Sequence, residues 1–342
     1  MPESCILVLN VGSSTLKYAL YETDTLTCIE RATLEGATGF SQIAAKCAGR
    51  SIGAVGHRLV HGGEAYTTAT VIDERVFSRL KSLVPLAPLH LPAEIRGIEE
   101  SQKLFPDAMQ VAAFDTAFHA SQPFLATQFA LPEAITTQGV RRYGFHGLSY
   151  ASIARQLAAQ GQGGKVIVAH LGSGASVCAL QDGVSVATSM GFSALEGLMM
   201  GTRCGRLDAG VLLYLLEQGY TIGQLTDLLY KQSGLLGVSG ISSDMRVLEN
   251  STDPKAERAI DLFCYRAASE MGALIPLLGG VDVFVFTGGI GEHSKQVREK
   301  ITAYFGWLPA LKTLVLQTDE ETEIAHQVKN LLFQICYGRM IF

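Results

Sequence analysis

The stretch ILVLNVGSSTLKYALY, residues 6–21, decides the fold that this sequence predicts. It opens as an apolar run rich in β-branched residues, breaks at GSS (12–14) and resumes as an alternating segment, TLKYAL (15–20). A period of two residues predicts a strand after the turn, so the stretch should form a β-hairpin. A nucleotide P-loop would instead need GxxxxGK[ST] followed by a helix.

The tip of this hairpin suits an anion. Asn10 and Lys17 flank the turn on either side, and Gly12 and the two serines supply a backbone amide and hydroxyl groups. Backbone N–H groups, hydroxyls and an ammonium can all donate to phosphate oxygens. Taken alone, however, the stretch fits an ordinary β-turn with a solvated lysine about equally well.

A second copy of this plan lies at residues 166–180, VIVAHLGSGASVCAL. Asp182-Gly183 predicts a type I′ turn into a strand at 184–187, and the first copy has its own third strand at 26–34. Two three-stranded meanders with glycine-serine tips indicate an internal duplication. Two such tips facing each other could hold a phosphate chain between two domains.

Bulk properties exclude several classes of protein. A chain of 342 residues, 48% hydrophobic and 17% charged, is long enough for two domains. A net charge of −5 argues against a general nucleic-acid binder. The start, MPESC, lacks the pattern of a signal peptide, and the most apolar region, 271–286, is interrupted by proline, glycines and an aspartate. Seven scattered cysteines without CxxC predict a reducing compartment and no zinc site. We therefore expect a cytoplasmic protein that does not bind membranes.

Polar groups follow several predicted strands. GHRLVHGGE (56–64) follows a strand at 52–55, where ligand sites of α/β proteins collect, and its Arg58 suits an anion better than solvent. The loop at 83–92 could form a pocket wall. Asp115 comes at the end of a strand expected over 111–119, where it could bind Mg²⁺ or simply cap a turn. His146 precedes a helix expected over 151–160.

The second half carries two glycine-rich segments. Residues 188–210 read as a long ordered loop in which Gly201 and Gly205 would let a ligand approach Arg203 closely. A strand at 281–286 runs into TGGIGE (287–292) and a helix, which favours a nucleotide phosphate or ribose. The same segment weakly resembles a dinucleotide fingerprint, but its third glycine is missing. A nicotinamide-dependent enzyme therefore ranks below a kinase.

Taken together, the motifs resemble the acetokinase (acetate kinase) family of the sugar kinase/heat-shock 70/actin superfamily. The resemblance runs from Ile6 to about Ala325 and rests on NVGSSTLK, GHRLVHGG, FDTAFH, RRYGFHG, HLGSGAS, TSMGF–LEGLMMGTR, SGISSDMR and FTGGIGE. It implies an α/β fold of duplicated actin-like (ribonuclease H-like) domains, with mixed sheets flanked by helices and an active-site cleft between the domains. One domain would hold 1–116 with a C-terminal helix, 322–342. The other, 117–321, would bind the nucleotide and form a homodimer.

The resemblance also implies an activity: Mg²⁺-dependent, reversible transfer of the ATP γ-phosphoryl group to acetate, with Mn²⁺ as a substitute metal. The family pattern gives the catalytic roles to Arg58, Asp115, His146 and Arg203. It gives the first phosphate site to Asn10, Ser13, Thr15 and Lys17, and the acyl pocket to Val60, Leu89 and Phe145 beside Arg58. It links Asn10, Asp115 and Glu320 to the metal.

For the nucleotide, the family pattern points to two turns and one helix start besides Lys17. These are His170, Gly172, Ser173 and Gly174, then Asp244, Met245 and Arg246, and last Gly289, Ile290, Gly291 and His293. Ala194 stands where the family has a pocket proline, which leaves propionate or another short-chain acid open as the substrate. A relative that kept the cleft but lost turnover is the other alternative.

Overall fold

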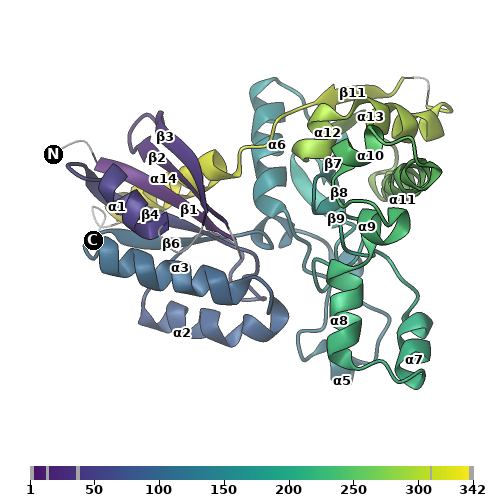
Figure 1. Cartoon of the computed structure of the whole chain (residues 1–342). Coiled ribbons are helices and arrows are strands. Elements are labelled where there is room, and N and C mark those ends of the chain that lie inside the picture. The colour runs from purple at the N-terminus through teal and green to yellow at the C-terminus, as the bar shows by residue number, and fades with distance from the viewer. Residues whose placement is uncertain (1–3, 13–14, 36–38, 309, 339–342) are drawn as a thin grey trace. The chain divides into compact units, whose positions relative to one another are not determined.

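The computed structural model describes residues 4–12, 15–35, 39–308 and 310–338. They form two compact units, considered one at a time below (Figure 1). The first unit holds the described residues of Met1–Ala120, His146–Ser152 and Asp319–Phe342, and the second holds those of Ser121–Phe145 and Ile153–Thr318. Residues 117–120, 146–152 and 319–321, which the sequence analysis placed in the second domain, thus cluster with the first. The acyl and nucleotide roles of the two domains stay predictions.

The first unit is built on a six-stranded mixed sheet in the order β3-β2-β1-β4-β6-β5. Its strands are β1 (Ser4–Val11), β2 (Thr15–Glu22), β3 (Cys28–Glu35), β4 (Ser51–Leu59), β5 (Thr70–Val71) and β6 (Met109–Phe114). β1, β2 and β3 form the antiparallel meander, whereas β1, β4 and β6 run parallel. The carboxyl ends of β1, β4 and β6 therefore meet at one edge of this sheet.

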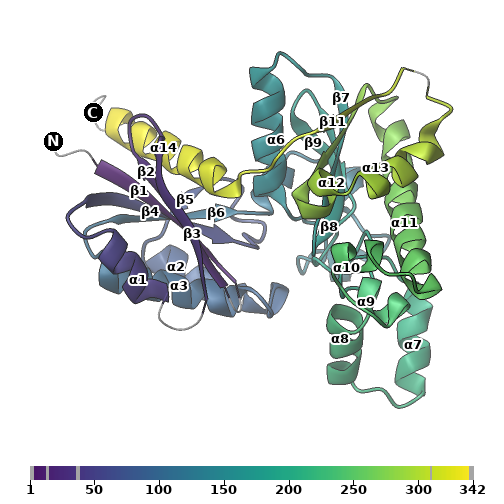
Figure 2. The same ribbon diagram turned by 45° about the horizontal axis from the view of Figure 1, so that its top comes forward.

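Helices cover both faces of this sheet (Figure 2). One face packs against α14 (Glu320–Gly338) and the other against α1 (Gly39–Lys46) and α3 (Leu91–Leu104). Alternate residues of β1 explain the division, since Ile6 and Val8 face α14 while Leu7 and Leu9 face the other side. Each of these fully buried side chains stabilises the fold by roughly 1.5–3 kcal/mol. The remaining elements are α2 (Glu74–Ser82), η1 (Val84–Leu86), η2 (Ala117–His119) and the start of α6 (Gly147–Ala159).

A glycine lets α14 lie close to the sheet. A Cβ on Gly56 of β4 would stand 2.7 Å from Ile324 Cγ2 and 2.8 Å from Val328 Cγ2. Real Cβ atoms essentially never approach so closely, so a larger residue at position 56 would push the helix outward. This close packing fixes the start of α14, and with it Glu320, near the carboxyl edge of the sheet.

The second unit repeats the plan of the first. Its sheet has the order β11-β10-β7-β8-β9, formed by β7 (Lys165–Leu171), β8 (Ala175–Gln181), β9 (Val184–Thr188), β10 (Val283–Thr287) and β11 (Lys312–Val315). β7, β8 and β9 form an antiparallel meander, and β10 runs parallel to both β7 and β11. Asp182 and Gly183 both have positive φ, 51° and 80°, as the expected type I′ turn requires. The predicted duplication and the mixed α/β fold are confirmed.

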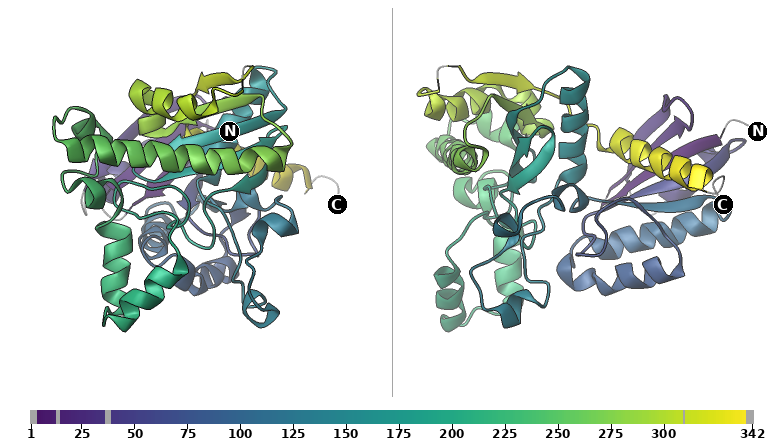
Figure 3. Two further views of the ribbon diagram at one scale, coloured as in Figure 1. Left: turned by 90° about the vertical axis from the view of Figure 1, so that its right-hand side faces the viewer. Right: turned by 180° about the vertical axis from the view of Figure 1, so that it is seen from behind.

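The long helix α11 (Pro254–Leu278) packs against β7, β8 and β9, and α6 lies on the opposite side of that sheet (Figures 2 and 3). Around this sheet lie the other elements, namely α4 (Phe124–Thr127), α5 (Glu133–Thr136), α7 (Ala209–Glu217), α8 (Ile222–Lys231), α9 (Gly234–Ser239), α10 (Met245–Glu249), α12 (Gly288–His293), α13 (Lys295–Thr302) and η3 (Ala303–Phe305). Within the described chain, no helix is both long and apolar enough to cross a membrane.

Three elements differ in extent from the sequence prediction. β4 continues to Leu59, so Arg58 lies inside a strand and not in the loop after it. The strand expected over 111–119 ends at Phe114, and a 3₁₀ turn follows. The helix expected to begin at 151 begins at Gly147, and its first turn contains the buried Ser149 and Tyr150. Each difference involves a residue of the candidate site, where local propensity is weakest as a guide.

Candidate active site

Four elements of the first unit bring polar side chains together around Arg58. The guanidinium of Arg58, on β4, lies 2.6 Å from Asp115 Oδ2, which follows β6. It donates to Asn10 Oδ1 of β1 at 3.3 Å, and its Nε lies 3.8 Å from Glu320 Oε2 at the start of α14. Parallel strands deliver the first three residues to one sheet edge, which is where ligand sites of α/β sheets form. The structure therefore gathers Asn10, Arg58, Asp115 and Glu320.

Burial dominates the electrostatics of this cluster. It raises the pKa of Asp115 above the usual range of an aspartate, while the neighbouring Arg58 acts in the opposite direction. Burial disfavours the charge on Arg58, yet the carboxyl groups of Asp115 and Glu320 are the main groups that outweigh it and raise the pKa of Arg58. Arg58 therefore stays a cation, and its positive charge interacts with more than one carboxyl group.

Asp115 keeps one carboxylate oxygen available. Its Oδ1 is buried and has no hydrogen bond of good geometry among the described residues, although the backbone N–H of Leu148 faces the carboxyl and favours its ionised form. A buried carboxylate oxygen without a donor is costly, and a metal ion would satisfy it. No group of three or more His, Cys, Asp or Glu gathers as metal ligands in the part of the chain that the structure describes. Mg²⁺, however, usually takes one or two protein carboxylates and completes its shell with water and phosphate oxygens. The donors around Asp115 fit that pattern.

The two histidines near Arg58 do not add positive charge. Burial lowers the pKa of His57 to about 4, although a hydrogen bond with Gln110 acts against this shift. Burial likewise lowers the pKa of His61 to about 4. Both rings are therefore neutral at pH 7, and the segment that reads as basic in the sequence carries a single cation, Arg58, among residues 56–64.

The hairpin tip of the first unit is described in part. Ser13 lies outside the described residues. The backbone N–H of Gly12 donates to the carbonyl of Thr15 at 2.8 Å, which closes the turn. Asn10 and Lys17 are cross-strand partners in β1 and β2, so their side chains project from the same face of the sheet. Lys17 is exposed.

His146 has an unusual backbone beside Asp115. Its φ is +59°, in the left-handed region that few residues other than glycine adopt. The next residue, Gly147, donates its N–H to the carbonyl of Asp115 at 2.9 Å, and a Cβ there would lie only 2.1 Å from that oxygen. Only glycine fits so close to the Asp115 carbonyl. Such strained positions cluster at functional sites.

The predicted acyl pocket is divided between the units. Val60 is buried after β4, and its N–H donates to Glu94 Oε2 at 3.0 Å. Leu89 is 41% exposed just before α3. Both belong to the first unit, whereas the buried Phe145 belongs to the second, so the structure does not bring all three together within either unit.

In the second unit, the glycine turn after β7 meets the loop that carries Arg203. Gly172 donates its N–H to the carbonyl of Gly174 at 3.0 Å, and Gly201 donates to the carbonyl of Ser173 at 3.2 Å. Arg203 donates to the carbonyl of Ala194 at 2.9 Å. His170, the next-to-last residue of β7, pairs in register with Thr287 of β10. The glycine turn at 172–174 and the loop at 188–210 therefore touch.

The other nucleotide-site candidates lie around this turn. A Cβ on Gly201 would stand 3.2 Å from the carbonyl oxygen of Ser243, which precedes Asp244, Met245 and Arg246. Asp244 caps α10 and pairs with Arg246 at 2.6 Å, while Met245 is buried. On the other side, a Cβ on Gly172 would stand 3.9 Å from the N atom of Gly289.

The segment after β10 forms the short helix α12. Gly289 is exposed, and a Cβ there would meet no atom within 4 Å. Ile290 is half-buried, Gly291 is buried and His293 is exposed. Glu292 accepts from the N–H of Gly288 at 3.0 Å and of Thr318 at 3.3 Å, so it fixes this turn. The surface at Gly289 is therefore open enough to receive a flat group.

Two acidic residues of these sites escaped the sequence analysis. Glu292 lies inside a motif that was singled out, but its role in bonding backbone N–H groups depends on contacts from other segments. Glu94 stands in an ordinary-looking helix start, LPAEIRG (91–97), and is nevertheless only 3% exposed. The one available signal was an acidic residue directly after the apolar proline loop.

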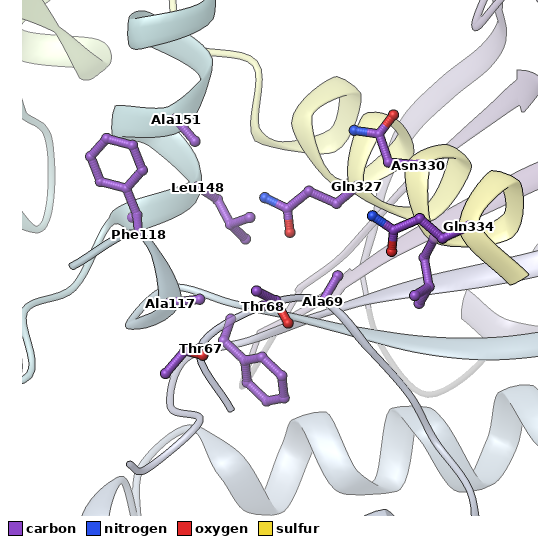
Figure 4. A pocket seen from close by; sticks show the side chains of 13 residues that line it. Thr67, Thr68, Ala69, Ala117, Phe118, Leu148, Ala151, Gln327, Asn330 and Gln334 are labelled. Carbon is purple, nitrogen blue, oxygen red and sulfur yellow. The ribbon is translucent and has the colours of Figure 1, made fainter. Parts of the chain in front are cut away.

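A separate cavity lies in the first unit between α14 and the segment after β6. It has a volume of about 350 Å³ and an aromatic and aliphatic floor that includes Phe114 and Leu148. Three carboxamides of α14, Gln327, Asn330 and Gln334, line it from one side (Figure 4). Its lining has no charged side chain, so it does not suit ATP or a carboxylate.

Comparison with known proteins agrees with this geometry. The model of the acetokinase family matches residues 38–333. An acetate kinase of Rhodopseudomonas palustris (strain TIE-1) is 46% identical over 344 residues, which cover 89% of this chain and 86% of that protein. Among solved structures, a propionate kinase from Francisella tularensis is 33% identical with a TM-score of 0.89, covering 96% of this chain and 99% of that one. Acetate kinase from Porphyromonas gingivalis is 34% identical with a TM-score of 0.86, covering 96% and 100%.

The family match covers well over half of the chain, and the matched residues include the ion pair between Arg58 and Asp115. The same match takes in the glycine turn after β7, the Arg203 loop and α12. This chain belongs to the acetokinase family.

Proposed function

We propose that this protein is an acetate kinase, which transfers the γ-phosphoryl group of ATP to acetate and gives acetyl phosphate and ADP reversibly. The observation that carries the proposal is the pair of the half-buried Arg58 and the buried Asp115 at the carboxyl edge of a duplicated sheet, in a chain of the acetokinase family. A cation for an anionic acceptor and a carboxylate for a metal are the groups that this reaction needs.

The reaction needs no strong base. Acetate is already ionised at neutral pH, so one of its oxygens attacks the γ-phosphorus while the bond to the bridging oxygen of ADP breaks. Catalysis then depends on aligning two anions and stabilising charge on the transferring group. We assign these tasks to Arg58 and Arg203, whose guanidinium groups suit a trigonal group of oxygens, with His146 as a further donor. Asn10, Ser13, Thr15 and Lys17 would hold the phosphate.

Asp115 and Glu320, with Asn10, would hold Mg²⁺ or Mn²⁺. The buried, unpaired Oδ1 of Asp115 supports this assignment. When bound, the metal neutralises charge on the phosphate oxygens. What the chain itself provides is a fixed carboxylate, since the ion pair with Arg58 holds the other oxygen of Asp115.

For the nucleotide, we assign the glycine turn with His170, Gly172, Ser173 and Gly174 to the phosphate chain. Asp244, Met245 and Arg246 would lie on the adenosine side, and Gly289, Ile290, Gly291 and His293 beside the adenine. The absence of any atom near a Cβ on Gly289 supports an open adenine pocket. ATP should therefore be the phosphoryl donor in preference to pyrophosphate.

The setting that we propose is the cytoplasm, with no nucleic-acid or membrane partner. The net charge of −5 supports the first exclusion. Seven cysteines fall in the described chain and none of them forms a disulfide, which supports a reducing compartment.

Acyl phosphate formation tests the activity and the acceptor together. With ATP and Mg²⁺, we expect the hydroxamate assay to show product from acetate, and from propionate with a kcat/KM within about tenfold of acetate. Ala194 replaces a pocket proline, and an extra buried CH₂ contributes about 0.8 kcal/mol if it fits. The hydrogen bond from Arg203 to the backbone carbonyl of Ala194 supports placing this position beside the proposed site.

The same panel, extended to formate, butyrate and pyrophosphate, separates the alternatives. No acyl phosphate from any acid would indicate a relative that has lost turnover. Activity with pyrophosphate but not ATP would contradict the open adenine pocket. A propionate kcat/KM more than a hundredfold below that of acetate would show that the pocket is not enlarged.

We also propose a homodimer formed through α7. This helix, AGVLLYLLE, has no buried residue, and its Leu213, Tyr214 and Leu216 are 64%, 58% and 45% exposed. Ile222, at the start of α8, is 79% exposed. Monomeric proteins rarely leave a contiguous apolar surface of this kind in water, and a second copy would cover it.

Charge on this helix should separate the subunits. We expect the wild type to have twice the 36.6 kDa mass of one chain in light scattering and Leu213→Glu to shift toward the monomer, because a buried unpaired carboxylate is costly. Phe333→Glu on α14 is the control, since Phe333 is 58% exposed in the other unit and should leave the mass unchanged. A wild-type monomer, or a Leu213→Glu dimer of full stability, would contradict the assignment.

A further inference from the structure

Glu94 is a buried acidic residue that the proposed reaction does not use. It lies in the first turn of α3 and is only 3% exposed. Its Oε2 accepts a hydrogen bond from the backbone N–H of Val60 at 3.0 Å. Acidic side chains are almost never fully buried unless a specific partner holds them, so this placement has a structural reason.

The bond joins two segments of the predicted acyl pocket. Val60 follows directly from β4, which carries Arg58. Leu89 lies between η1 and α3, and Glu94 follows it by five residues, in the first turn of α3. Glu94 therefore ties the Val60 side of the pocket to the Leu89 side, and without it the N–H of the buried Val60 would lose its partner.

Charged groups from two other elements face the same carboxyl. Arg58 of β4 favours its ionised form, whereas Asp115 after β6 and the burial itself disfavour it. Burial is the largest effect and raises the pKa of Glu94 to about 8. Arg58 and the hydrogen bond from Val60 act in the opposite direction but do not cancel the effect of burial, so the pKa favours a carboxyl that satisfies Val60 without adding a full charge near pH 7.

We propose that Glu94 is a positioning residue that ties Val60 to the Leu89 segment and thereby sets the shape and the charge of the acceptor site beside Arg58. This rests on the proposed function of Arg58 and Val60 as the acyl-binding residues. Arg58 already faces the carboxylates of Asp115 and Glu320. A third negative charge beside it would repel an acetate ion, so the affinity for the acceptor should depend on the proton of Glu94.

Two substitutions separate the tie from the charge. Glu94→Gln keeps an oxygen that can accept from Val60 but cannot ionise, and Glu94→Ala removes the acceptor. Glu99→Gln is the control, because Glu99 lies on the same helix in an exposed pair with Lys81 at 3.0 Å. The readout is KM for acetate and kcat, measured between pH 6 and 10 at saturating ATP and Mg²⁺.

In the wild type and in Glu99→Gln, KM for acetate should rise by up to tenfold per pH unit above about pH 8, with kcat at saturating acetate nearly unchanged. Glu94→Gln should keep a low KM across this range. Glu94→Ala should raise KM at every pH and change the propionate-to-acetate ratio of kcat/KM by at least threefold, since the pocket wall loses its tie.

Stability supplies a readout that does not depend on activity. The pKa of Glu94 is higher in the folded protein than in the unfolded chain, so its contribution is fully present below the unfolded value, near pH 4.5, and is lost as pH rises through about 8. The urea midpoint of the wild type should therefore fall more between pH 5 and pH 9 than that of Glu94→Gln. If the urea midpoint falls equally in the two proteins, Glu94 is not protonated in the folded state, and this part of the proposal is refuted.

The outcomes distinguish this inference from the proposed function. A wild type that forms no acyl phosphate at any pH refutes the function itself. An active wild type whose KM for acetate stays flat from pH 7 to 10, or a Glu94→Gln protein with the same alkaline rise as the wild type, refutes the role of Glu94.

Discussion

Replacing Arg203 with alanine is expected to lower kcat by about 10²–10⁴, equivalent to roughly 3–5 kcal/mol of transition-state stabilisation. If Arg203 contacts the transferring phosphoryl group, its interaction strengthens as charge spreads over the oxygens, so kcat must fall. If it only adds to a basic surface, KM should rise and kcat should stay nearly intact. Steady-state kinetics with acetate and ATP separate these cases.

Arg58→Ala should show a fall of similar size, and Arg→Lys should restore little at either position. A point charge cannot reproduce the planar fork of the guanidinium group. The double variant should be worse by less than the sum of the two effects, because both residues act on one group. Arg203→Ala is the cleaner test, since removing Arg58 also leaves the buried Asp115 without its cation.

Arg206→Ala is a matched control for Arg203. Arg206 lies three residues further along the same loop, and its exposed side chain pairs with Glu270 at 3.1 Å. Its loss should leave kcat within about twofold, because exposed ion pairs contribute little. A folded Arg203→Ala protein with near-normal kcat would contradict the assignment and place the phosphoryl site elsewhere.

Replacing Asp115 should damage both activity and stability. We expect Asp115→Asn to lower kcat by at least about a hundredfold and to raise the Mg²⁺ concentration needed for half-maximal activity, because the amide is a weaker metal ligand. Asp115→Ala should in addition lower the free energy of unfolding by roughly 2–4 kcal/mol, because it leaves the half-buried guanidinium of Arg58 with only the more distant carboxylate of Glu320. Magnesium titration of kcat and urea unfolding measure the two effects.

Asp261→Asn is the matched control. Asp261 pairs with Lys300 at 2.7 Å on the surface of the second unit, and its loss should change the free energy of unfolding by less than about 1 kcal/mol. A purely structural role for Asp115 would appear as lost stability in the alanine variant with an unchanged Mg²⁺ requirement in the asparagine variant. That result would remove Asp115 from the proposed metal site.

Local patterns in the sequence determined the secondary structure of the two meanders. The alternation in residues 15–20 and 175–180 predicts strands because successive strand side chains point to opposite faces, and Asp182-Gly183 predicts its turn because both residues tolerate positive φ. The duplicated plan follows from comparing the two stretches. Arg58, Asp115 and His146 could also be singled out from their motifs, since glycine-rich strand ends are where such groups act.

Tertiary structure decided how these residues interact. Arg58, Asp115, Asn10 and Glu320 are far apart in the chain, and the parallel order of β1, β4 and β6 with the packing of α14 brings them together. Burial, which no short window of sequence reveals, makes His57 and His61 neutral. It also turns Glu94, an unremarkable acidic residue of a helix start, into the partner of Val60. Local pattern fixes elements because propensity and periodicity act over a few residues, whereas charge and protonation depend on the low dielectric that distant segments create when they pack.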